Sequence, residues 1–195
     1  RRSFIKKIGL FGGGVVLANM AKAQQVSVFE KPLINANKSI ILSTWSHGVP
    51  ANLEAMQTIH KGGNILDAVE NGVRVIESDA ENGSVGIGGR PDREGHVTLD
   101  ACIMDSQGNA GSVCFLEGFE HPISIARAVM EKTPHVILAG DGAAQFALEQ
   151  GFEEIDLLTP KAKKDWEEWK MKSDYQPKVN VENHDTIGMI GMHRG

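Results

Sequence analysis

The sequence predicts an α+β fold on three observations. From residue 39 onward, apolar β-branched runs typical of strands alternate with stretches of helical periodicity. Two of the expected strands are joined by a short polar turn, as in an antiparallel hairpin. The composition, 41% hydrophobic and 23% charged in 195 residues, is that of an ordinary globular domain. Disordered chains, collagen-like repeats and small disulfide scaffolds are therefore excluded.

Each expected element follows from a local pattern. Apolar runs with β-branched residues predict strands, and apolar residues three or four apart predict helices. Glycines and prolines between these runs mark where the helices end. The expected strands are 39–44, 97–104, 111–116 and 136–139, with a strand pattern from 179 through 190. The expected helices are 51–60, 65–77, 122–132, 143–150 and 161–172.

Charge is distributed unevenly along the chain. Residues 1–23 carry five basic side chains and no acid, so the other 172 residues hold 15 basic and 25 acidic ones, a net charge of −10. Such an acidic body lacks the positive surface that binds a phosphate backbone, which argues against a nucleic-acid partner.

The first 23 residues predict an export signal. Arg-Arg-Ser-Phe-Ile-Lys-Lys is followed by an apolar run over 8–17 and then by Ala21-Lys22-Ala23. A basic start, a short apolar stretch and a small-x-small end are typical of a signal peptide, and the paired arginines resemble a twin-arginine (Tat) signal. We expect cleavage after Ala23 and a periplasmic or secreted bacterial protein with no further membrane contact. A basic amphipathic first helix is the alternative.

Cysteine and histidine usage argues against a metal site. Cys102 and Cys114 are too few for a four-cysteine zinc site, and the seven histidines lack zinc-ligand spacing. We expect both cysteines to be buried in their strands, with a bridge between adjacent strands as the alternative.

Two glycine-rich loops and a tryptophan pair have structural interpretations. The loop 86–89 lacks the residues of a phosphate cradle and indicates close backbone approach between strands. The loop 140–142 lacks the third glycine of a dinucleotide fingerprint, so a tight turn is expected. Trp166 and Trp169 share one helix face, and we expect a packing stripe there rather than a ligand box.

One run combines groups that can act together chemically. His184 and Asp185 directly precede Thr186, which opens an expected strand. A threonine hydroxyl can attack the carbonyl before it and form an ester, which water splits to leave threonine as a new N-terminus. Its α-amine, with a pKa near ~7.7–8.0, can then act as the base for its own hydroxyl. The alternative interpretation is an ordinary turn before a strand.

From residue 37 to its end, the chain resembles the glycosylasparaginase (aspartylglucosaminidase) family of N-terminal-nucleophile (Ntn) hydrolases. His-Asp-Thr sets this family apart from plant-type asparaginases and isoaspartyl peptidases, in which a glycine usually precedes the threonine. The motifs are Leu42-Ser-Thr-Trp45, Gly88-Gly-Arg-Pro-Asp92, Val97-Thr-Leu-Asp-Ala-Cys-Ile-Met-Asp105, Ala126-Arg-Ala-Val-Met-Glu-Lys-Thr-Pro-His135 and Asn183-His-Asp-Thr-Ile-Gly-Met189.

The resemblance implies a four-layer αββα sandwich made as a self-cleaving precursor. Residues 24–185 would form the α chain, and residues 186–195 would begin the β chain. Thr186 would be the catalytic nucleophile that releases aspartate from glycosylated asparagine, and His184 and Asp185 would assist self-cleavage. Trp45 would wall the substrate pocket. The resemblance implies no metal or organic cofactor and a pairing of αβ units into (αβ)2.

Two departures from the family pattern bear on the site. His47 stands where close relatives carry an aromatic residue, typically Phe, so a substrate-binding role is carried to it only weakly. Only ten residues follow residue 185, so we expect a C-terminal truncation that removes the groups holding the substrate's α-carboxylate, α-amine and oxyanion. An asparaginase or isoaspartyl peptidase stays open as an alternative, as does a non-catalytic secreted binding protein with this fold.

Overall fold

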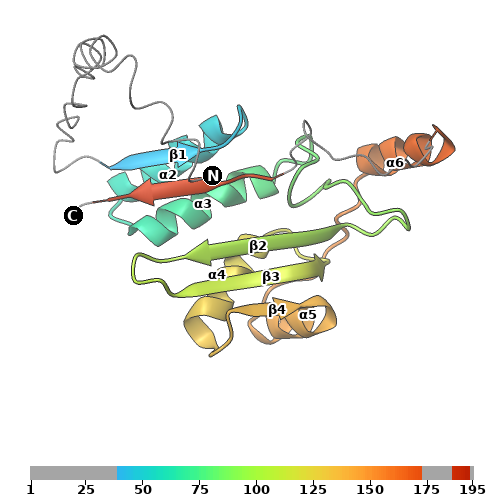
Figure 1. Cartoon of the computed structure of the whole chain (residues 1–195). Helices are drawn as coiled ribbons and strands as arrows, with labels where there is room; N and C mark the ends of the chain where they lie inside the picture. The colour runs from blue at the N-terminus through green and yellow to red at the C-terminus, as the bar shows by residue number, and fades with distance from the viewer. Residues whose placement is uncertain (1–38, 173–185, 194–195) are drawn as a thin grey trace, which may run out of the picture. The chain divides into compact units, whose positions relative to one another are not determined.

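The structure, a computed structural model, describes residues 39–172 and 186–193. The predicted signal peptide over residues 1–23 lies outside the described residues, as do His184 and Asp185. Strands and helices alternate in the described part, which confirms the α+β class (Figure 1). The elements are β1 (Ile40–Ser43), α2 (Gly48–His60), α3 (Ile65–Glu77), β2 (Thr98–Met104), β3 (Ala110–Glu117), α4 (Pro122–Lys132), β4 (Ile137–Ala139), α5 (Gly140–Glu149), α6 (Pro160–Lys172) and β5 (Met189–Met192).

The described strands form two small sheets. β1 and β5 pair antiparallel although they lie at opposite ends of the described sequence, with Ser43 opposite Met189 (Figure 1). The second sheet has the order β2-β3-β4, in which β2 and β3 form the predicted antiparallel hairpin and β4 joins β3 in parallel. The β2–β3 register shifts between Leu99 and Ala101, so Asp100 lies opposite a bulge that Cys114 and Phe115 form on β3.

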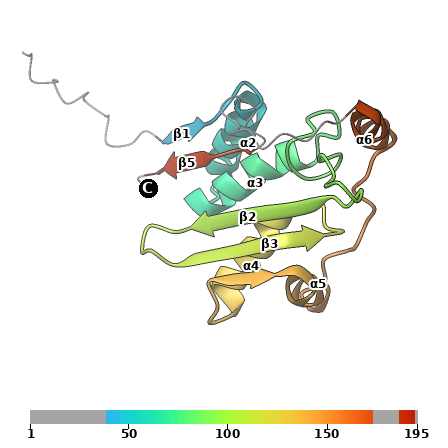
Figure 2. The same cartoon turned by 45° about the vertical axis from the view of Figure 1, so that its right-hand side comes forward.

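Helices cover one face of these strands. α4 packs on β2 and β3, while α2 and α3 pack on β1 and β5 (Figure 2). Gly111 allows α4 to come close, because a Cβ there would meet the backbone oxygen of Ala126. The largest side chains fully buried in this core are Phe119, Ile76, Leu116, Ile125, Val113 and Val129.

Ion pairs add to the apolar contacts between α3 and α4. The Arg127 guanidinium on α4 lies 2.7 Å from carboxylate oxygens of Asp67 and Glu70 on α3, and 2.7 Å from Glu131 on its own helix. Burial disfavours the Arg127 charge, but the three carboxylates outweigh burial and raise the pKa of its guanidinium. The arginine therefore fastens the two helices together with a permanent charge.

The opposite strand face carries large apolar side chains in the open. Leu42 and Ile190 face each other across β1 and β5 and are 63% and 73% exposed, and Met104 on β2 is 67% exposed. Cys102 is exposed and Cys114 half-buried, both as free thiols, so the expectation that both are buried is wrong. Side chains alternate between the two faces of a strand, and these two point away from α4.

Element boundaries agree with the sequence where local signals are strong. α3 and α4 have the predicted bounds, and Asn64 and Asp67 form a capping box at the start of α3. α2 and α5 begin three residues earlier than predicted, at Gly48 and Gly140. None of the helices that the structure describes is long and apolar enough to span a membrane.

The C-terminal strand is shorter than predicted. β5 begins at Met189, and residues 186–188 precede it outside any strand. The part of the expected strand pattern over residues 179–185 lies outside the described residues. Thr186 is thus close to the start of a strand rather than within one.

Candidate active site

Thr186 lies on the wall of the larger described cavity, whose volume is about 670 Å³. Its side chain is exposed, whereas those of Ile187 and Met189 are half-buried against the main hydrophobic core. Neighbouring side chains on an extended segment point to opposite sides. The two apolar residues therefore anchor the segment in the core, while the Thr186 side chain stays exposed on the cavity wall.

Thr44 fixes the backbone just after Thr186. Its N–H donates to the carbonyl of Gly188 over 2.9 Å, and its Oγ1 accepts a hydrogen bond from the N–H of Gly188, also over 2.9 Å. This pair of bonds continues the β1–β5 ladder by one position beyond Ser43 and Met189. Gly188 is two residues from the predicted nucleophile, so β1 controls where that nucleophile lies.

The loop after α3 forms another part of the cavity wall. Gly86 has a φ of +63°, and a Cβ on this residue would collide with the carbonyl of Glu77 at the end of α3. Gly88, with a φ of +75°, lies similarly close to the carbonyl of Ala80. The predicted close backbone approach is confirmed, but the expectation that it occurs between strands is wrong, because the glycines approach the end of helix α3 and the loop that follows it.

A buried carboxylate also lines the cavity. Glu77 is 2% exposed, and its Oε1 accepts the N–H of Ile123 at the start of α4 over 3.1 Å. Its Oε2 lies 3.3 Å from Nδ1 of His121. Burial raises the pKa of the Glu77 carboxyl, while the hydrogen bonds from His121 and Ile123 oppose this rise.

The β2–β3 hairpin contributes polar groups from its open face. Asp100 accepts the N–H of Phe115 over 2.7 Å, which holds the bulge in place. The same carboxylate raises the pKa of the Cys114 thiol through a hydrogen bond. That thiol is therefore held protonated and is poorly suited to act as a nucleophile. The polar cavity-lining residues of the hairpin are Thr98, Asp100, Cys102, Ser112 and Cys114.

The predicted substrate-binding residues lie just beyond β1. Trp45 has a φ of +62°, and its side chain is 50% exposed. A left-handed backbone is costly for a bulky residue and is often found at functional sites. His47 precedes α2, and its buried Nε2 has no hydrogen-bond partner among the described residues. Neither residue lines the Thr186 cavity, so the substrate-binding roles of both stay predictions.

Sequence reasoning missed three charged residues that line this cavity. Arg90 and Asp100 lie within family motifs but were given no role. Asp100 was detectable as a charged residue inside an otherwise apolar strand. Glu77 looked like the ordinary polar end of an amphipathic helix, and its burial depends on where α4 begins.

Within residues 39–172 and 186–193, no group of three or more His, Cys, Asp or Glu side chains could hold a metal ion.

Comparison with known proteins shows the family of the chain. A family model described as Asparaginase matches residues 45–194, which include Thr186 and most of the cavity wall. The chain belongs to this asparaginase family. The match confirms the family relationship that the sequence motifs indicate.

Named relatives in the family are similar over most of the chain. An N(4)-(β-N-acetylglucosaminyl)-L-asparaginase from Elizabethkingia miricola is 55% identical over 98% of this chain and 56% of its own length. The mouse enzyme of that name is 32% identical over 91% of this chain and 61% of its own length. A plant-type L-asparaginase from Pyrococcus furiosus is 45% identical over 57% of this chain and 37% of its own length. The chain thus spans little more than half the length of these first two relatives.

Proposed function

We propose that the complete protein is an amidohydrolase that cleaves N4-(β-N-acetylglucosaminyl)-L-asparagine into aspartate and the sugar amine. The observation that carries the proposal is the exposed position of Thr186 on the wall of a large cavity, on a segment that β1 fixes. Relatives that share 55% and 32% identity over nearly the whole chain are named for this activity.

Self-cleavage would generate the nucleophile. The Thr186 hydroxyl attacks the carbonyl carbon of Asp185, and the C–N bond breaks as the acyl group moves to oxygen. Water then hydrolyses the ester, leaving a carboxylate on Asp185 and a free α-amine on Thr186. We assign assistance of this step to Asp185 and His184, which lie outside the described residues.

The same threonine would then perform hydrolysis. Its neutral α-amine takes the hydroxyl proton as the oxygen attacks the side-chain amide carbon of the substrate. The sugar amine leaves with a proton, and an ester remains between the aspartyl group and Thr186. Water attacks that ester, releases aspartate and restores the hydroxyl. No other group of the described chain needs to act as the base.

We infer a four-layer αββα sandwich for the complete protein, with residues 24–185 as the α chain and residues 186–195 as the start of the β chain. The exposed apolar side chains of Leu42, Ile190 and Met104 on one strand face support a second sheet packed against that face. Two such αβ units would pair into (αβ)2, as the family resemblance implies.

We propose export of the protein through the twin-arginine signal over residues 1–23, to the periplasm or the medium of a bacterium. The basic start and the short apolar run support this assignment. N-terminal sequencing of the exported protein tests it. A mature chain that begins at residue 24 is expected, and a chain that retains Arg1 would contradict it.

An asparaginase or isoaspartyl peptidase is the second candidate. The plant-type asparaginase relative supports it at 45% identity, but over only 57% of this chain. Asp185 also stands directly before Thr186, where those relatives usually carry a glycine, which favours the glycosylasparaginase assignment. A non-catalytic binding protein would have no need to retain Thr186.

Substrate comparison with two variants tests the proposal. The protein from its complete reading frame is incubated with glycosylasparagine, asparagine and an isoaspartyl dipeptide, and aspartate release is measured. Glycosylasparagine is expected to have the highest kcat/KM. Thr186→Ala is expected to abolish both processing and hydrolysis, whereas Thr186→Ser keeps a hydroxyl and retains part of both. Full activity of the alanine variant would disprove the role of Thr186.

A further inference from the structure

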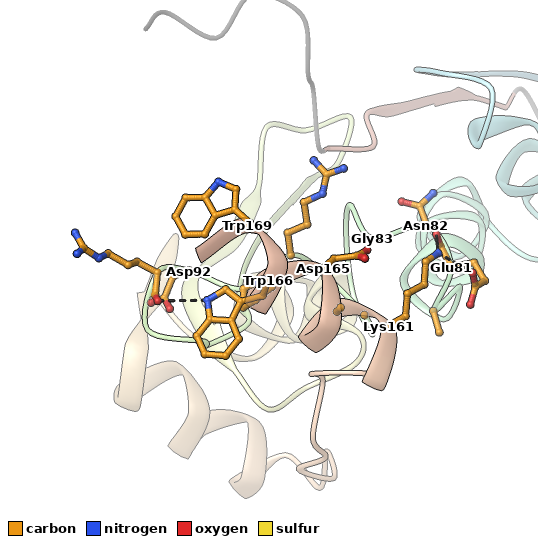
Figure 3. Close-up of a pocket in the computed structure, with 14 residues that line it drawn as sticks. Glu81, Asn82, Gly83, Asp92, Lys161, Asp165, Trp166 and Trp169 are labelled. Carbon is orange, nitrogen blue, oxygen red and sulfur yellow. Dashed lines mark hydrogen bonds and ion pairs between the residues drawn. The ribbon is translucent and has the colours of Figure 1, made fainter. Parts of the chain in front are cut away.

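A second cavity of about 420 Å³ lies between α6 and the loop that follows α3. The α6 residues that line it lie one, four, five and eight positions after Lys161, the first of them, so they share one helix face. Figure 3 shows the labelled lining residues, which are Lys161, Asp165, Trp166 and Trp169 on α6 and Glu81, Asn82, Gly83 and Asp92 on the facing loop. Its volume lies within the roughly 300–1,000 Å³ of typical small-molecule sites. We call this cavity the α6 groove.

The α6 groove adjoins the Thr186 cavity. Gly83 and Arg90 line both cavities, so the loop after α3 forms a wall that the two cavities share. An extended ligand whose reactive end lies at Thr186 can therefore continue past this loop towards α6. A small substrate such as free asparagine would not extend that far.

The two tryptophans of the groove are used differently. The Trp166 indole donates to the carbonyl of Arg93 over 3.3 Å, the Lys170 ammonium lies 4.6 Å from its ring centroid, and its ring packs on Gly95. Trp166 therefore holds the loop against α6. Trp169 lines the same groove but is 48% exposed. The expectation that it packs against the protein as part of a stripe is therefore wrong. Its indole presents an apolar surface to any molecule in the groove.

The charges of the groove balance. Its lining has three basic side chains, Arg90, Arg93 and Lys161, and three acidic ones, Glu81, Asp92 and Asp165. Lys161 pairs with Glu81 at 2.6 Å. A carboxylate oxygen of Asp92 accepts the backbone N–H groups of three residues of its own loop. A balanced lining does not select a phosphate or a polycation, both of which need an excess of one sign.

Carbohydrate fits this combination of groups. The C–H face of a sugar ring packs on an exposed indole, while its hydroxyls both donate and accept hydrogen bonds. Arg90 supplies donors and Asp165 supplies acceptors in the same groove. We propose that the α6 groove is a carbohydrate subsite that binds the glycan beyond the amide-linked sugar, with Trp169 as its stacking residue. This inference rests on the proposed glycosylasparagine hydrolysis.

The test compares two substrates of different glycan length. Asparagine carrying one N-acetylglucosamine and asparagine carrying N,N′-diacetylchitobiose are hydrolysed by the complete protein and by its Trp169→Ala variant. Alanine preserves α6, because it is the best helix former. The substitution is expected to lower kcat/KM about tenfold more for the two-sugar substrate than for the one-sugar substrate. Met171→Ala is the matched control, since Met171 is 79% exposed on the same helix and does not line the groove.

The possible outcomes distinguish a failure of the carbohydrate subsite from a failure of the proposed activity. An equal loss on both substrates, or no loss, would overturn the carbohydrate subsite and leave the proposed activity intact. If the unaltered protein hydrolyses neither substrate, the proposed activity fails instead. In that case the subsite is tested by adding free N,N′-diacetylchitobiose to the protein and measuring its tryptophan fluorescence. A saturable change that Trp169→Ala abolishes and Met171→Ala preserves supports it, and no change in the unaltered protein overturns it.

Discussion

The two faces of the strands are built in different ways. On the helix-covered face, Val113 and Leu116 are almost fully buried beneath α4, and Arg127 ties α4 to α3. On the other face, Asp100 and Cys102 are exposed and line the cavity that holds Thr186. The covered face thus supports the strands, and the open face supplies exposed polar groups to the cavity wall.

This difference shows how the Thr186 segment can be held in a fixed position while the Thr186 side chain stays exposed. The Thr186 segment takes its position from the covered side, through Ile187 and Met189 in the core and through Thr44 on β1. Its exposed side chain lies on the cavity wall. Substitutions on the two faces should therefore differ in kind, with stability affected on one side and chemistry on the other.

The largest effect is expected where the open face carries apolar side chains. If a second sheet covers Leu42 in the complete protein, Leu42→Asp buries a charge and lowers the free energy of unfolding by about 4 kcal/mol. Met171→Asp, on the 79% exposed position of α6, should change it by less than about 0.5 kcal/mol. Urea unfolding of the complete protein measures both. A neutral Leu42→Asp would contradict the four-layer arrangement.

A slightly smaller effect is expected at the link between α3 and α4. Arg127→Met leaves the carboxylates of Asp67 and Glu70 without their partner and should lower the free energy of unfolding by about 3 kcal/mol. Arg127→Lys keeps the charge but not the planar fork, so its loss should be smaller. Equal losses in both variants, measured by urea unfolding, would show that charge alone does not stabilise this contact.

The contact that positions Thr186 should affect catalysis more than folding. Thr44→Val removes the acceptor for the N–H of Gly188 while keeping the side-chain shape, and should lower kcat about tenfold. Thr44→Ser restores the hydroxyl and should recover most of that rate. The readouts are kcat, the rate of precursor cleavage and the urea midpoint. A Thr44→Val protein with unchanged kcat would show that the Oγ1 contact does not position the nucleophile.

The smallest effect is a pH dependence at Glu77. Because burial raises its pKa, the folded protein holds the Glu77 proton more tightly than the unfolded chain, whose carboxyl has a pKa near 4.5. The contribution of the Glu77 carboxyl to the free energy of unfolding is therefore fully present below pH 4.5, and it declines as the pH rises through the folded-state pKa. Glu77→Gln cannot ionise and should lose this decline. Parallel stability curves for the two proteins above pH 4.5 would contradict the assignment.

Much of the fold was predictable because its signals are local. α3 has a capping box and an apolar stripe, and α4 starts at Pro122 and ends before Pro134, so both were predicted with their bounds. The hairpin was predictable from the polar turn between β2 and β3. The β1–β5 pairing was not, because residues far apart in sequence leave no local signal of which strands meet.

The candidate site was predictable only at Thr186, where the chemistry of self-cleavage requires a fixed order of residues. A hydroxyl residue directly after a carboxylate and an imidazole identified Thr186, and the structure places it on a cavity wall. The wrong expectations about Cys102, Cys114 and Trp169 have one cause. An apolar or aromatic residue in a regular element shows which face it lies on, but not whether anything covers that face.

The most direct test of the central claim is an intact mass with N-terminal sequencing of the protein expressed from its complete reading frame. We expect two chains, one of which begins Thr186-Ile-Gly-Met, because the proposed mechanism requires Thr186 to become an N-terminal nucleophile. Thr186→Ala should yield one uncut chain. A folded, unaltered protein that also stays as one chain would contradict the assignment of Thr186 as a self-generated nucleophile.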